Sequence, residues 1–415
     1  MRKTIYHLPK ARRHGHGSRA VVPITLRWVL LILVVAAVGW VQLRSYERQL
    51  HALQQQDGDP HGSGSGQVFA SAACAAKLEA AGVLPKSRDR HAGHAMDISD
   101  AAGATDLSVK LLTARRRLYD AMEASLLSSG LTLGSTITQG LGLGDMFRLG
   151  EDGRLQPVLE PLEVPVRAIV MPLLDRHASE RLLGAVKRHL APLVPPNGMW
   201  LQDSKAYHST IFHASTHTDP VPASAAEVDS EEVAIRAVGV QACPLHVVLE
   251  RVVATPAGTV VACWQIVDGT DVSELRRRLA SALPRASRHQ IVQDHFILHT
   301  TLARIVAPPH AGEAGAAAAQ RLRQRALKQR QRQRAGRRQQ GAGGDGGEAA
   351  GEEAAVLLQV AVDQMTQELC GMEVTMDQLW FAEEYHKLAL ALNGRVEKHD
   401  IPLKCAGGGQ AAAAG

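Results

Sequence analysis

Two copies of one short pattern, a histidine two residues before a threonine and an apolar residue, stand out in this 415-residue chain. They read HSTI at 208–211 and HTTL at 299–302. A bare His-x-Ser/Thr is common in a chain with 19 histidines, but these two are its only His-x-Thr cases. Each copy lies in a segment rich in β-branched and apolar residues, which is typical of a strand.

The spacing gives these residues a shared chemistry. Residues i and i+2 of a strand point to the same face, about 6.5–7 Å apart, so His208 lies with Thr210 and His299 with Thr301. One neutral imidazole can take a proton from water while a protonated one gives a proton to a leaving oxygen. Two hydroxyls can donate to phosphoryl oxygens, where charge gathers in the transition state. The pattern predicts phosphodiester hydrolysis without a metal or other cofactor.

Other histidines offer rival sites. His213, followed by Ser215, lies five residues from His208 and would face the opposite side of a regular strand. His208, His213 and His217 together suggest a metal cluster. The odd separation scatters them over both faces, however, and no carboxylate or thiol completes the set.

Further side chains near the motifs have two interpretations. Arg304 pairs either with a substrate phosphate or with an internal carboxylate, and its three-residue offset from Thr301 favours the face away from the site. Tyr207, Phe212 and Trp200 are able to stack on a base, but packing in the core is favoured for these aromatic rings.

The segments around the motifs alternate between strand and helix patterns. Strands are predicted at 164–174, 206–214, 295–306 and 371–384, and a pair of strands at 245–267. Amphipathic helices are predicted at 179–193, 225–240, 271–283 and 354–370. This β-α-β-α-β-β-α-β-α-β order predicts an α+β fold with two similar halves.

The motifs resemble those of a known family. AYHSTI and FILHTTLARI are similar to the paired His-x-Ser/Thr-hydrophobic motifs of the 2H phosphoesterase superfamily, which includes RNA ligase/cyclic nucleotide phosphodiesterase-like proteins. MWLQDSKAYH and CPLHVVL resemble a plant and algal membrane-anchored branch of that family. The resemblance covers about 160–310 and 355–385.

That resemblance implies a bilobal fold in which two antiparallel sheets flank a cleft, with helices outside. It implies that His208 and His299 are acid and base, and that Thr210 and Thr301 bind the substrate phosphate. The implied substrates are 2′,3′-cyclic phosphates of nucleotides or RNA ends. The alternative is a non-catalytic membrane-anchored module that binds a phosphorylated ligand or partner.

An apolar segment near the N-terminus predicts membrane attachment. Residues 21–43 form a transmembrane signal anchor in which Arg27 reaches the interface; a cleaved signal peptide is the alternative. Six Lys or Arg precede the segment, which predicts a cytosolic N-terminus. We therefore expect a single-pass type II protein of the endomembrane system (ER or Golgi) with a lumenal C-terminal domain, or else an organelle-targeted chain.

Charge and composition divide the chain into parts. The net charge of +5 arises from residues 1–48, with nine Lys/Arg and one acid, and from 310–355, with nine and five. The rest is acidic, which excludes a basic nucleic-acid-binding core, and no stable nucleic-acid complex is expected. The predicted parts are a tail (1–20), the anchor (21–43), a stem with helical segments (44–159), the phosphoesterase-like domain (160–310 and 355–395), a low-complexity insertion (311–354) and a flexible tail (396–415). The pattern specifies no oligomeric state.

The five cysteines show no CxxC pair and no zinc-site spacing. Cys243 and Cys263 flank a predicted strand-turn-strand segment and would pair in an oxidising lumen. Two separate buried thiols are an equally good interpretation.

Overall fold

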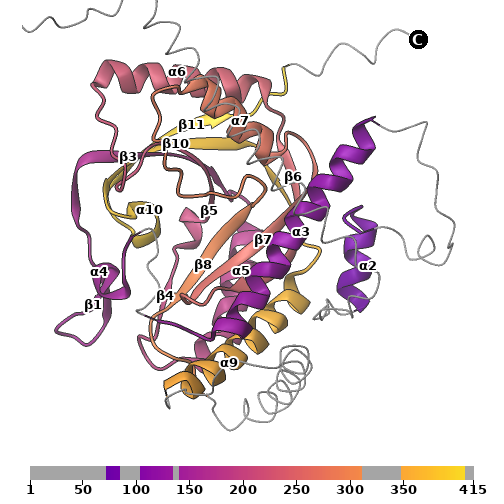
Figure 1. Ribbon diagram of the computed structural model, residues 1–415, viewed down its shortest axis with the longest axis vertical. Coiled ribbons are helices and arrows are strands. Elements are labelled where there is room, and N and C mark those ends of the chain that lie inside the picture. The colour runs from indigo at the N-terminus through magenta and orange to yellow at the C-terminus, as the bar shows by residue number, and fades with distance from the viewer. Residues whose placement is uncertain (1–71, 85–102, 134–139, 311–346, 407–415) are drawn as a thin grey trace, which may run out of the picture. The chain divides into compact units, whose positions relative to one another are not determined.

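Figure 1 shows the computed structural model of the chain, which describes residues 72–84, 103–133, 140–310 and 347–406. The chain from 68 onward forms one compact unit. The predicted tail 1–20 and anchor 21–43 lie outside the described residues, as does 311–346 of the predicted insertion. Within the described part, no helix has the length and apolar character to cross a bilayer.

The described chain is α+β, as predicted. Its helices are α2 (Ala72–Ala80), α3 (Gly103–Ser129), α4 (Leu143–Met146), α5 (Arg176–His189), α6 (Ala225–Gln241), α7 (Val272–Ala282), α9 (Gly347–Leu369) and α10 (Ala389–Leu392). Its strands are β1 (Phe147–Leu149), β2 (Leu155–Pro157), β3 (Pro161–Pro172), β4 (Met199–Leu201), β5 (His208–Ser215), β6 (Leu245–Ala254), β7 (Thr259–Asp268), β8 (His299–Ile305), β9 (Glu373–Met376), β10 (Gln378–His386) and β11 (Val396–Pro402). The predicted strands and helices of the domain are present with ends shifted by a few residues, except that the strand predicted at 371–384 is two strands, β9 and β10, in different sheets.

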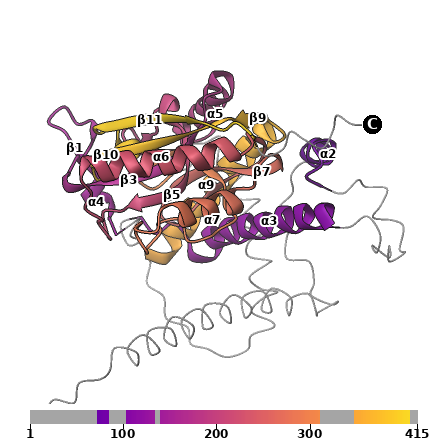
Figure 2. The same ribbon diagram turned by 90° about the horizontal axis from the view of Figure 1, so that it is seen from above.

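One antiparallel sheet has the strand order β11-β10-β3-β5, which leaves β5 at an edge. Helix α6 lies against β10 and β11 (Figure 2). Arg167 of β3 points to that helix and forms an ion pair with Glu231 at 2.7 Å. The opposite face of β3 carries Val170 and Ala168, which pack on Trp380 of β10.

The second antiparallel sheet has the order β4-β8-β7-β6-β9. Helix α9 packs on β6, and α3 contacts β6 and β7. Tyr119 of α3 is fully buried, and its hydroxyl lies 2.8 Å from the carbonyl of Trp264. The β6–β7 turn requires glycine, since Gly258 has a φ of 78° and a side chain there would meet the Ile305 carbonyl.

The helix ends follow local capping rules. The Asp175 side chain accepts from the Ala178 amide at the start of α5, and Ser224 forms a capping box with Glu227 at the start of α6. Asp271 caps α7. These caps fix where each helix begins, so the apolar faces of α5 and α7 meet the main core.

The compact unit extends beyond the predicted domain limits. Much of the predicted stem belongs to it, because α3 buries Arg115 and Tyr119 against the second sheet. At the other end, β11 pairs with β10 along its whole length, although it lies in the predicted flexible tail. The sequence of β11, VEKHDIP, has the charged character of an edge strand and so lacks the alternation that signals a strand.

Of the two interpretations of Cys243 and Cys263, the disulfide between them is wrong and the pair of buried thiols holds only for Cys263. Cys243 is bonded to Cys405 and Cys74 to Cys370, while Cys263 is a buried free thiol. Cys263 lies within β7 with its side chain packed near Tyr119. The amide of Cys405 instead donates to the carbonyl of Ala242, which brings the segment after β11 to the end of α6.

These disulfides predict a definite thiol count. The oxidised protein should show no reactive thiol when folded, one when denatured (Cys263) and five after reduction, as measured with a chromogenic thiol reagent. Two or more thiols in the denatured, unreduced protein would contradict the pairing.

Removing one disulfide should lower stability. Because Cys243–Cys405 closes a chain separation of 162 residues, replacing both cysteines by serine should lower the free energy of unfolding by about 2–4 kcal/mol. Denaturant unfolding measures this change. The control is the single variant Cys263→Ser, which removes a thiol and leaves both disulfides in place.

Candidate active site

The two motifs occupy equivalent places at the starts of β5 and β8. On β5, His208 and Thr210 are half-buried while the intervening Ser209 is buried. On β8, His299 and Thr301 are half-buried around a buried Thr300. The structure therefore places each predicted histidine with its threonine on the more open face of its strand. We call these two faces together the motif face.

The two motif strands meet through the residues between each histidine and threonine. The hydroxyls of Ser209 and Thr300 are 3.2 Å apart, and the Trp264 indole donates to the Thr300 hydroxyl at 3.0 Å. The Thr300 hydroxyl thus accepts from Trp264 and shares a further hydrogen bond with Ser209. This contact brings together strands β5 and β8, which belong to different sheets. The charge of His208 contributes to the lowered pKa of His299.

Both motif strands contain a β-bulge directly after the threonine. On β5 the partners of Thr210 and Phe212 are consecutive residues of β3, so Ile211 is the additional residue. On β8 the partners of Thr301 and Ala303 are consecutive residues of β7, so Leu302 is the additional residue. A bulge reverses which face the following side chains occupy. Beyond both motifs, the faces that side chains occupy are therefore not those expected from the alternation of a regular strand.

The bulges correct two predictions of side-chain direction. His213, expected opposite His208, pairs with Ala168 and shares the face of Thr210. Arg304, expected to point away from Thr301, lines the same recess as Thr301. The sequence carries a signal for both: HSTIFH and HTTLAR align residue by residue, with His213 and Arg304 in the sixth position.

The recess at Thr301 is narrow. Trp200, Gln202, Leu388 and Leu392 line it together with Thr301 and Arg304, among others. Its volume of about 10 Å³ holds no more than one water molecule. The recess by itself is therefore too small to hold a substrate.

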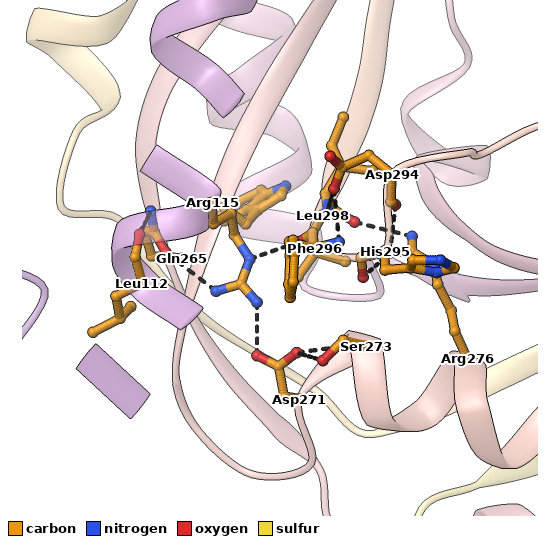
Figure 3. A network of polar contacts seen from close by, with 12 residues as sticks. Leu112, Arg115, Gln265, Asp271, Ser273, Arg276, Asp294, His295, Phe296 and Leu298 are labelled. Carbon is orange, nitrogen blue, oxygen red and sulfur yellow. Dashed lines mark hydrogen bonds and ion pairs between the residues drawn. The ribbon is translucent and has the colours of Figure 1, made fainter. Parts of the chain in front are cut away.

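Arg276 of α7 holds the two motif strands in place, a role that the sequence did not reveal (Figure 3). The side chain is 5% exposed and donates only to main-chain carbonyls. Its acceptors are the carbonyls of Thr210, Ile211, Asp294, His295 and Ile297, at 2.7–3.3 Å. Two of these lie at the β5 bulge and the others in the segment that enters β8. One guanidinium thus fixes the bulge of one motif and the approach to the other.

A second arginine, on α3, also binds the segment that leads into β8. Arg115 of α3 donates to the Phe296 carbonyl at 2.8 Å and to the capping Asp271 at 2.7 Å (Figure 3). Asp294 accepts from the amides of Phe296 and Ile297. The loop before His299 therefore takes its shape from side-chain contacts.

His208 is held in one orientation. Its Nδ1 lies 2.8 Å from the carbonyl of Ala206, so Nδ1 carries a proton and donates to that oxygen. Nε2 is then the nitrogen available to a substrate. Burial lowers the pKa of His208 below its usual value, the Ala206 carbonyl partly offsets that effect, and the charge of Lys398 lowers it further.

The pKa values of His299 and His213 are also lowered. Burial lowers the pKa of His299 to about 4, helped by the charges of Arg276 and His208. Burial also lowers the pKa of His213 to about 4, with smaller contributions from His217 and His208. In the free protein His299 and His213 are therefore neutral imidazoles at pH 7.

The three aromatic residues considered as base-stacking groups pack into the protein. Tyr207 is fully buried and Phe212 is 7% exposed. Trp200 packs on Phe147, with ring centroids 5.5 Å apart, and donates to the Ala391 carbonyl. Among the described residues, no group of three His, Cys, Asp or Glu is arranged to hold a metal ion.

A larger depression lies away from the motifs. Its volume is about 430 Å³, and its lining includes His246, Glu373 and Asp175. It is open to solvent, and its histidine is 39% exposed and paired with Glu373 at 3.2 Å. Size alone favours this depression, but His208 and His299, whose pKa values are lowered, lie on the motif face.

Comparison with known proteins gives low similarity. No protein-family model and no curated protein matches the sequence. The conserved protein of unknown function ATU0111 from Agrobacterium tumefaciens is similar at 14% identity and a TM-score of 0.34, over 58% of this chain and 86% of that chain. The apo form of E. coli LigT is similar at 15% identity and a TM-score of 0.26, over 36% of this chain and 81% of that chain. These values are too low to carry a function, which has to be argued from the geometry.

Replacing Arg276 tests its role as a clamp. Arg276→Lys keeps the charge but offers one nitrogen to five carbonyls, and each buried carbonyl left without a donor costs about 1–3 kcal/mol. We expect unfolding free energy to fall by at least about 2 kcal/mol in denaturant titration. Arg277→Lys is the matched control on the same helix, because that side chain is 69% exposed, and it should change stability by less than about 0.5 kcal/mol. Equal stability of both variants would contradict the clamp.

Proposed function

We propose that this protein is a metal-independent phosphodiesterase that hydrolyses 2′,3′-cyclic phosphates of nucleotides or RNA ends. The observation that carries the proposal is the pairing of two His-x-Thr strands through the Ser209–Thr300 contact. That contact supports a site in which two imidazoles and two hydroxyls act together. Such a set provides an acid, a base and two donors to phosphoryl oxygens.

The pKa shifts suggest how the two histidines divide the work. Burial lowers the pKa of His299 to about 4, so it is the neutral base. His208 has a carbonyl on Nδ1 that favours its protonated form, so it is the acid that donates from Nε2. Each role follows from the environment of the imidazole, since the two motifs are alike in sequence.

The reaction then proceeds in one displacement. His299 takes a proton from water as the water oxygen bonds to phosphorus. The bond from phosphorus to one ribose oxygen breaks, and that oxygen takes the Nε2 proton of His208. Thr210 and Thr301 donate to the non-bridging oxygens, and the cation of Arg304 beside Thr301 stabilises their charge. The product is a phosphate monoester, and proton exchange with solvent restores both histidines.

A second candidate is a non-catalytic module that binds a phosphorylated ligand. The lowered pKa values of both motif histidines favour it, because a free protein with two neutral imidazoles has no acid to donate at pH 7. Binding of an anionic phosphate would have to raise one of these pKa values for catalysis to proceed.

We further propose that the domain lies in an oxidising lumen, tethered by residues 21–43. Two disulfides among five cysteines support this proposal, since such bonds persist in secretory compartments and are rare in the cytosol.

Activity assays test the first proposal. Full-length protein with adenosine 2′,3′-cyclic phosphate should yield a monoester, and His208→Ala or His299→Ala should lower kcat by about 10²- to 10⁴-fold. His177→Asn, an exposed change on α5, is the control and should act like wild type. Chelator should leave the rate unchanged. Equal activity of wild type, His208→Ala and His299→Ala, or loss of activity with EDTA, would contradict the mechanism.

The pH profile tests the division of roles. The active form has His208 protonated and His299 neutral, so it predominates above about pH 4 and below the His208 pKa, which is lower than 6.5. We expect kcat/KM to peak in this acidic window and to fall about tenfold per pH unit above it. A maximum at pH 8 would contradict the assignment.

Lys398 gives that profile an internal control. Its ammonium stands 4.0 Å from the Trp380 ring centroid and lowers the His208 pKa. Lys398→Gln should therefore move the alkaline limb of kcat/KM to higher pH and leave the acid limb in place. Movement of the acid limb alone would mean that the alkaline limb does not report His208.

A further inference from the structure

The motif face of β5 carries a third polar residue, His213, which the phosphodiesterase mechanism does not use. His213 follows the β5 bulge as Arg304 follows the β8 bulge, each five residues after its motif histidine. Because both bulges reverse the strand parity, both side chains join the face of the neighbouring threonine. His213 is thus the structural counterpart of Arg304 in the other half of the site.

The backbone groups of His213 have hydrogen-bond partners, whereas Nδ1 of its side chain has none among the described residues. Gln290 accepts from the His213 amide at 2.8 Å and donates to its carbonyl at 2.9 Å. The side chain is 5% exposed, and its Nδ1 has no hydrogen-bond partner among the described residues. A buried polar atom without a partner is costly. The fold therefore keeps an unused hydrogen-bonding atom beside Thr210.

Arg304 and His213 differ in charge. Arg304 remains a cation, since burial lowers its pKa only to about 10. His213 is neutral at pH 7 because its pKa is about 4. A guanidinium favours a phosphate oxygen, whereas a neutral imidazole offers a single hydrogen bond to an uncharged group. The two halves of the site thus suit different parts of one ligand.

We propose that His213 is a specificity residue whose Nδ1 hydrogen-bonds an uncharged group of the nucleoside, on its ribose or base, while Arg304 binds the phosphate. The assignment rests on the proposed function, because it takes the ligand to be a nucleoside phosphate. It adds a polar contact for the part of the substrate that does not react.

Binding of two probes to the full-length protein tests this assignment. Calorimetry with inorganic phosphate reports the anion site alone, and adenosine 2′-monophosphate reports the anion and nucleoside together. His213→Leu should weaken nucleotide binding about three- to tenfold, the loss of one hydrogen bond, and leave phosphate binding within about twofold. His213→Asn, which keeps a neutral polar group near the Nδ1 position, should restore most of the loss. Arg304→Gln should weaken both probes.

The possible results separate the two proposals. If wild type binds neither probe, the proposed function fails and the assignment falls with it. If wild type binds the nucleotide and His213→Leu binds it equally well, or loses phosphate to the same extent, only the assignment is overturned. Should His213→Leu not fold, the wild-type protein labelled with ¹⁵N-histidine supplies the test. The Nδ1 signal of His213 should move with nucleotide and not with phosphate, and an unmoved signal overturns the assignment.

Discussion

The arrangement of the site depends on one buried guanidinium. Arg276 binds five carbonyls, two at the β5 bulge and three in the segment that leads into β8, and among the described residues no carboxylate forms an ion pair with it. Burial lowers its pKa to about 10, so it stays charged at neutral pH. The same charge lowers the pKa of His299. Arg276 therefore holds the segment that leads to His299, and its charge adds to the effect of burial on the pKa of that histidine.

The two bulges show how a repeated motif produces unequal halves. HSTI and HTTL are nearly the same peptide, and both place a histidine and a threonine on the motif face. The difference arises in the next residues, where one half presents a neutral imidazole and the other a cation. The residues beyond the bulges thus make the two halves chemically different without altering either motif.

Local pattern was sufficient to predict much of this fold. The strands, the helices and the pairing of His208 with Thr210 and of His299 with Thr301 follow from periodicity. The directions of His213 and Arg304 did not, because a bulge depends on the partner strand and on Arg276, which lies far away in sequence. The Cys243–Cys405 bond was missed for a related reason, since β11 is a charged edge strand whose pairing depends on β10. The position of residues 21–43 stays a prediction.

The disulfides have a consequence for the integrity of the chain. Each joins a cysteine that precedes residue 311 to one that follows residue 346. A protease that cut the backbone once between these positions would leave two fragments held by two covalent bonds. The nicked protein would migrate as a single species until reduced, and α9, β9, β10 and β11 would remain attached to the half that carries both motifs.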